Sequence, residues 1–173
     1  MIVGLPKEIK NNEHRVGLTP SSVKEIVANG HEVFVENNCG KEIGFTNEKY
    51  EEAGAKILNS PSEIYGKSEL IVKVKEPVPA EYDLIQVGQL IYTYFHLAAV
   101  PDLAKVLLEK KVSAVAYETI TAPDGRLPLL VPMSQVAGRM ATQVGAQYLQ
   151  RERGGKGVLL GGVPGTRKGR VVI

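Results

Sequence analysis

The sequence predicts an α/β protein: a parallel sheet with helices on both faces, followed by a long linking helix. Three observations indicate this. Short apolar, β-branched runs alternate with helical segments from residue 2 to residue 116. Prolines stand at helix starts, as at Pro20 and Pro101. From residue 133 to residue 150, apolar side chains then recur at helical spacing. Alternating strands and helices are typical of a parallel sheet covered on both faces.

Each element has its own local signal. Thr19 is a good N-cap, Pro20 fits the first helical position, and Gly30 ends the segment. The apolar runs predict strands at 2–5, 31–36, 70–74, 89–95 and 112–116, with a small edge strand at 55–58. Helices are expected at 20–30, 46–53, 61–65, 80–85 and 101–111. This order is that of a Rossmann-like or flavodoxin-like domain, which binds ligands at the carboxyl ends of its strands.

The chain divides into three parts by composition. Residues 1–126 form the α/β domain, residues 127–153 a long helix, and residues 154–173 a glycine-rich tail in which a strand is expected to begin at Arg170. Gly138, Ala141 and Gly145 form a stripe of small residues on the helix. We therefore expect this helix to bridge two domains or two subunits.

Composition limits the classes of function. Hydrophobic residues make up 43% and charged residues 23%, as in ordinary globular proteins. The 21 Lys and Arg against 19 Asp and Glu leave a net charge of +2, without the basic, aromatic-rich runs of nucleic-acid binders. The single cysteine, Cys39, rules out an intramolecular disulfide and fits a reducing compartment. The sequence begins without a signal peptide and has no apolar run of membrane-spanning length, so the cytoplasm is the expected location.

Three polar residues lie at or just beyond expected strand ends: Arg15, Lys75 and His96. Two cations and an imidazole suit a small α-keto or α-amino acid, since the cations hold its oxygens and the imidazole exchanges protons near neutral pH. Each also has a structural reading: Arg15 as a surface ion pair, Lys75 as an edge-strand lysine, and His96 as a histidine bonded to the backbone. Of the two lysines that end the strand, Lys73 and Lys75, one is expected to face a cleft and the other solvent.

Other sites are excluded. The segment 162–169 lacks the GxxxxGK[ST] spacing of a phosphate loop and precedes a strand instead of following one. No GxGxxG occurs. His14, His31 and His96 belong to three different segments, so no metal-ligand cluster is visible.

Four motifs together resemble the N-terminal part of NAD-dependent alanine dehydrogenases: GLPKEIKNNEHRVGLTP from Gly4, KVKEP from Lys73, YFHLAA from Tyr94 and LPLLVPMSQVAGRMATQVGAQYL from Leu127. The resemblance extends over essentially the whole chain. The related proton-translocating nicotinamide nucleotide transhydrogenases share the first motif and the long helix. They lack the lysine of KVKEP and the histidine of YFHLAA, so the dehydrogenase is favoured.

The resemblance implies roles for individual residues. Arg15 would bind the substrate carboxylate, Lys75 the carboxylate or carbonyl oxygen, and His96 would be the acid/base group. Met133 and Ser134 would lie near the nicotinamide of NAD, and Glu118 would shape the cleft. In the reaction that the resemblance implies, alanine gives a hydride to NAD, water adds to the iminium, and pyruvate and ammonia are released.

The resemblance also implies that the NAD-binding domain, which follows the long helix, is largely absent from these residues. We therefore expect a substrate-binding domain that does not turn over alone, because hydride transfer needs a cofactor held against the substrate. Two alternatives remain: a stand-alone module that binds pyruvate or alanine, and an assembly module whose long helix is a subunit interface. The family resemblance implies a homo-oligomer.

Overall fold

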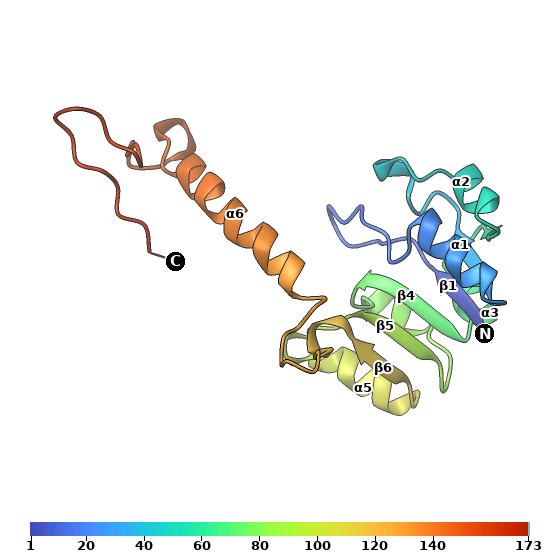
Figure 1. Cartoon of the computed structure of the whole chain (residues 1–173). Helices are drawn as coiled ribbons and strands as arrows, with labels where there is room; N and C mark the ends of the chain where they lie inside the picture. The colour runs from blue at the N-terminus through green and yellow to red at the C-terminus, as the bar shows by residue number, and fades with distance from the viewer. Residues whose placement is uncertain (173) are drawn as a thin grey trace. The chain divides into compact units, whose positions relative to one another are not determined.

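The computed structural model describes residues 1–172 and divides into two compact units, Met1–Ile120 and Thr121–Ile173 (Figure 1). The first unit is built on one sheet, whose strands are all parallel and lie in the order β3-β2-β1-β4-β5-β6. The strands are β1 (Ile2–Leu5), β2 (Glu32–Glu36), β3 (Lys56–Leu58), β4 (Leu70–Lys75), β5 (Leu90–Tyr94) and β6 (Ser113–Ala116). The predicted fold class is confirmed, including the edge position of the short strand β3.

The first unit, residues 1–120, has five helices, two of which begin at a side-chain cap. They are α1 (Pro20–Ala28), α2 (Asn47–Glu52), α3 (Pro61–Lys67), α4 (Pro79–Tyr82) and α5 (Pro101–Glu109), with 3-10 turns η1 (Lys41–Ile43), η2 (Leu97–Ala99) and η3 (Tyr117–Thr119). The Thr19 side chain accepts the Ser22 N–H at 3.3 Å, and Ser60 Oγ accepts the Glu63 N–H at 3.3 Å. Each bond satisfies one of the N–H groups left over at a helix start.

Two hydrophobic clusters lie on opposite faces of the sheet. On β2, Val33 and Val35 belong to one cluster and Phe34 to the other, because side chains alternate along a strand. Helices α1 and α2 complete the first cluster with Val23 and Tyr50. The second cluster includes residues of α3 and α5: Ile64, Tyr65, Leu103 and Leu107. Burial on both faces therefore fixes the sheet and the positions of its strand ends.

Strand β1 lies in the middle of the sheet: β2 and β3 are added on one side of it, and β4, β5 and β6 on the other. The order of the strands therefore reverses between β1 and β4, which is the switch point of the sheet. In open parallel sheets the loops that follow such neighbouring strands run to opposite faces and leave a crevice at the carboxyl ends. The β1–α1 loop, residues 6–19, and the end of β4 meet at this position. Arg15 belongs to the first segment and Lys75 to the second.

The second unit contains α6 (Val131–Tyr148) and the turn η4 (Arg151–Arg153) (Figure 1). Helix α6 begins two residues before the expected start of helical periodicity at Met133. Residues 121–172 contain no buried side chain. Residues 170–172 are not in a strand, contrary to expectation, and Ile173 lies outside the described residues. Among residues 1–172, no helix is both long and apolar enough to cross a membrane.

Candidate active site at the strand ends

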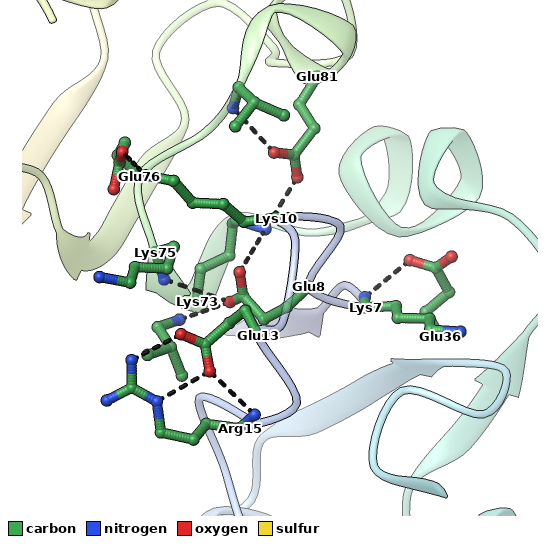
Figure 2. Close-up of polar contacts among 12 residues, drawn as sticks. Lys7, Glu8, Lys10, Glu13, Arg15, Glu36, Lys73, Lys75, Glu76 and Glu81 are labelled. Carbon is green, nitrogen blue, oxygen red and sulfur yellow. Dashed lines mark hydrogen bonds and ion pairs between the residues drawn. The ribbon is translucent and has the colours of Figure 1, made fainter. Parts of the chain in front are cut away.

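Arg15 lies in the β1–α1 loop with its guanidinium held by a neighbouring carboxylate. Glu13 accepts hydrogen bonds from the Arg15 backbone N–H at 3.0 Å, from Nε at 2.8 Å and from Nη2 at 2.6 Å (Figure 2). The hydrogen bonds from Arg15 hold the pKa of Glu13 below its ordinary value, and the bond to Glu13 raises the pKa of Arg15. The guanidinium is therefore oriented before any ligand arrives, while 43% of the Arg15 side chain remains exposed.

The loop that carries Arg15 runs directly against β4. A Cβ added at Gly17 would lie 2.9 Å from the carbonyl oxygen of Val72, closer than side chains normally approach a backbone oxygen. Glycine permits this contact because it has no side chain. The approach brings the Arg15 loop close to the strand that ends in Lys75.

Lys75 is the last residue of β4 and is half-buried. Among residues 1–172, its ammonium has no hydrogen bond or ion pair in the structure, but its charge contributes to the lowered pKa of Glu13. In Figure 2 the side chains of Lys75 and Arg15 extend toward the same side of the view. Glu13 therefore lies within the electrostatic reach of both cations.

Of Lys73 and Lys75, one was expected to face the cleft and the other solvent. For Lys73 this expectation was wrong. Its side chain is only 1% exposed, with Nζ 2.9 Å from Glu81 Oε1 and 3.4 Å from Glu8 Oε2. Residues two apart in a regular strand project to the same face, and here that face is covered by helices. The β4–β5 pairing also shifts between Val72 and Lys75, which separates the surroundings of the two lysines.

His96 follows β5 in a left-handed backbone conformation, with φ of 49° and ψ of 38°. A residue other than glycine rarely adopts this conformation, and such strain gathers at functional sites. The carboxylate of Glu118 accepts the His96 N–H at 2.8 Å and the Phe95 N–H at 3.3 Å, and so holds the turn in place. Glu118 thus contacts the backbone around the histidine.

A pocket of about 460 Å³ opens beside this turn. Its lining is mainly apolar and consists of Phe95, His96, Leu97, Ala98, Ala99, Ala116, Glu118 and Thr119. His96 and Glu118 therefore share a pocket, which neither Arg15 nor Lys75 lines.

Tyr94 connects the two parts of the site, and sequence reasoning did not identify it. Its Cα pairs with that of Lys75 across β4 and β5, and its ring centroid lies 6.4 Å from that of His96. Tyr94 is also a lesser cause of the raised pKa of the Arg15 guanidinium, after the hydrogen bond to Glu13. Tyr117 packs against Tyr94 with ring centroids 4.8 Å apart. The only sequence signal was an aromatic two residues before the histidine.

Of the predicted residues, Arg15 follows β1, Lys75 is the last residue of β4 and His96 follows β5. These three strands are neighbours in the sheet. Met133 and Ser134 belong instead to the second unit, where both are exposed on the first turns of α6. Among residues 1–172, no group of three His, Cys, Asp or Glu side chains is placed to hold a metal ion. The sequence did not identify the carboxylates that pair with the cations, Glu13 with Arg15 and Glu8 with Lys73. The loop 7–15 contains several charged residues, and nothing in the sequence distinguishes these two from the others.

The fold defines a class of protein: a doubly wound α/β domain, here with Arg15 and Lys75 near its switch point and a mainly apolar pocket beside the end of β5. The chain belongs to the family described as "Alanine dehydrogenase/PNT, N-terminal domain", whose model matches residues 4–137. A second model, "Alanine dehydrogenase/PNT, C-terminal domain", matches residues 141–173.

Individual relatives agree with this family. The alanine dehydrogenase of Methanococcus maripaludis is 52% identical over 173 residues, which cover 100% of this chain and 46% of the relative. That of Bacillus subtilis is 55% identical over 174 residues and is covered to 45%. A solved L-alanine dehydrogenase superposes with a TM-score of 0.85 at 52% identity, over 98% of this chain and 46% of that one. The chain thus matches the N-terminal part of these relatives and spans just under half their length.

A transhydrogenase from Sinorhizobium meliloti is a more distant structural neighbour. Its TM-score is 0.64 at 24% identity, over 68% of this chain and 35% of that one. At this identity the likeness shows the shared fold alone.

Proposed function

We propose that this chain forms the substrate-binding part of an NAD-dependent alanine dehydrogenase, which converts L-alanine, NAD and water to pyruvate, ammonia and NADH. The observation that carries the proposal is that Arg15 lies in the loop after β1 and Lys75 at the end of β4, the two strands that flank the switch point, with His96 after the next strand. Membership of the alanine dehydrogenase/PNT family supports it. The division into a substrate-binding domain at 1–126, a linking helix at 127–153 and a tail at 154–173 belongs to the same proposal.

Each residue has a task that its chemistry suits. Arg15, oriented by Glu13, binds the substrate carboxylate through its guanidinium. Lys75 contacts the carboxylate or the carbonyl oxygen as a point charge. His96 takes a proton from the water that attacks C2 and returns it as the amine leaves, a task that suits an imidazole because its nitrogens can accept and donate a proton. Glu118 holds the turn on which His96 stands.

NAD would accept the hydride, but the described residues do not fit a complete dinucleotide site. Met133 and Ser134 offer one thioether and one hydroxyl near the start of α6, and no strand in residues 1–172 runs into GxGxxG. We propose these two residues as contacts near the nicotinamide. The residues described here would bind and orient the substrate without turning it over.

Two other proposals differ in what they predict. A stand-alone module would bind pyruvate or alanine without any dinucleotide domain, whereas a dehydrogenase part would support alanine-dependent NADH formation once such a domain is supplied. A homo-oligomer is also proposed, since Met133, Val136, Met140 and Val144 are exposed along α6. A monodisperse monomer by light scattering at high concentration would contradict the oligomer.

We further propose a cytoplasmic location and a small-molecule substrate, with neither nucleic acid nor membrane as a partner.

The test is a calorimetric titration of the chain with pyruvate, beside Arg15→Ala, Lys75→Ala and His96→Ala. We expect saturable binding that Arg15→Ala weakens at least about 30-fold, because removing one partner of a close charge pair commonly costs 2 kcal/mol or more. Lys75→Ala should also weaken binding, and His96→Ala should do so least. Acetone, which lacks the carboxylate, is the control ligand. Equal affinities for pyruvate and acetone would exclude a carboxylate site.

A further inference from the structure

Glu8 is a buried carboxylate in the charged β1–α1 loop. It follows β1 by three residues, yet its side chain is only 4% exposed. Its Oε1 accepts the Val74 N–H at 2.6 Å and lies 3.4 Å from the Lys75 N–H (Figure 2). The loop that carries Arg15 is therefore tied by one carboxylate to the end of the strand that carries Lys75.

The end of β4 needs hydrogen-bond acceptors from outside the sheet because its regular pairing stops there. Paired positions with β1 are limited to Leu70 and Ile71, and the pairing with β5 shifts between Val72 and Lys75. Buried N–H groups that leave a ladder require other acceptors. The carboxylate of Glu8 supplies one at the residue that precedes Lys75, and so fixes the backbone from which the lysine projects.

A second set of contacts fixes Glu8 itself. Lys73 lies between Glu8 and Glu81, 3.4 Å from Oε2 of the first and 2.9 Å from Oε1 of the second. Glu81 also accepts the Tyr65 hydroxyl at 3.0 Å and the Val78 N–H at 3.0 Å. A buried charge without an opposite charge beside it is costly, so the ion pair with Lys73 favours the observed position of the Glu8 carboxylate.

We propose that Glu8 is a positioning residue for the carboxylate site: it holds the end of β4, where the pairing register shifts, so that Lys75 projects beside Arg15. Glu8 acts through the backbone of Val74 and Lys75 and does not touch the substrate. The inference rests on the proposed function, since it assigns Lys75 to ligand binding. It adds that Glu8, the one carboxylate beside Lys73 in residues 1–172 that also bonds the backbone at Val74, sets the geometry of that site.

The test compares Glu8→Gln with Glu81→Gln in the full chain. Both variants neutralise one carboxylate beside Lys73, but only Glu8 contacts the β4 backbone at residues 74 and 75. Amide hydrogen exchange at Val74 and Lys75, measured by NMR without ligand, reports the hydrogen bonds between Glu8 and the β4 backbone. Pyruvate affinity, measured by calorimetry, reports their consequence. Thermal unfolding shows whether each variant is folded.

In Glu8→Gln we expect exchange at the Val74 amide to accelerate at least tenfold and pyruvate affinity to fall about tenfold, the equivalent of 1.4 kcal/mol. In Glu81→Gln both should stay within about threefold of the parent. If Glu8→Gln does not fold, the double variant Glu8→Gln/Lys73→Met, which leaves no unpaired ammonium, takes its place. Unchanged exchange and affinity in Glu8→Gln, or equal losses in both variants, would overturn the proposal.

A failure of the proposed function can be distinguished from a failure of the inference about Glu8. If the parent chain itself does not bind pyruvate, the proposed binding by these residues fails, while the exchange data still decide the tie. Accelerated exchange confined to Glu8→Gln would then support the tie, and unchanged exchange would overturn it.

Discussion

Strand β4 and helix α6 are both rich in apolar residues, but the structure buries those of only one. In β4, Ile71, Val72 and Val74 lie between helices on two faces of the sheet, each at most 7% exposed. In α6, Val136 and Met140 are 55% and 51% exposed, and no residue of that helix is buried. Stability in the described residues therefore comes mainly from the first unit, which also carries the candidate site.

The difference shows what an amphipathic pattern does and does not establish. Periodicity along α6 predicts a helix and a face, and both are present. It does not specify what covers that face. In the first unit the same kind of pattern is matched by neighbouring elements, which turns an apolar stripe into a core.

The largest effect should come from truncating a core side chain. Leu103 of α5 is fully buried, so Leu103→Ala should lower the free energy of unfolding by about 2 to 5 kcal/mol through lost burial and a cavity. Met140→Ala in α6 is the matched change and should stay within about 0.5 kcal/mol. Urea denaturation measures both. Similar losses in the two variants would mean that α6 has a covered face in solution.

A smaller effect is expected at the start of α1. Thr19→Ala removes the side-chain acceptor of the Ser22 N–H and should cost about 1 kcal/mol. Thr19→Ser keeps the hydroxyl and serves as the control. A loss of equal size in Thr19→Ser would point to the methyl group and not to the cap.

The smallest effect concerns the pKa of Glu13. Its pKa is lowered first by hydrogen bonds from Arg15 and only last by the charge of Lys75. Because the folded pKa lies below the unfolded one, the pair stabilises the fold above the ordinary glutamate pKa of about 4.3, and this contribution is lost as pH falls through the folded value. An NMR titration of the Glu13 carboxyl should show a larger upward shift in Arg15→Met than in Lys75→Met. The reverse order would contradict the geometry of the site.

Much of the fold followed from local signals. Thr19 with Pro20, and the β-branched runs of β1 and β4, predicted elements within a few residues of their observed bounds. The sequence also predicted Arg15, Lys75 and His96 at or just beyond strand ends, and the strands concerned, β1, β4 and β5, are neighbours in the sheet. These predictions succeeded because they depend on backbone preferences and on parallel topology, both of which are visible in a single sequence.

The rest depended on contacts distant in sequence. Lys73 was expected to face a cleft or solvent, and Glu8 lies in a polar loop, yet the two side chains pair across 65 residues of chain in the interior. The register shift between β4 and β5 and the left-handed turn at His96 have no local signature in residue type. Such features arise from packing between separate segments, which residue patterns do not specify.

The most direct test of the account is an NMR titration of the chain with pyruvate that follows the backbone amides of the first unit. We predict saturable shifts at residues 13–15, 74–76 and 94–96 that disappear in Arg15→Lys, which keeps the charge but loses the guanidinium fork. Shifts confined to the pocket beside His96, or equally large in Arg15→Lys, would contradict a carboxylate site between the ends of β1 and β4.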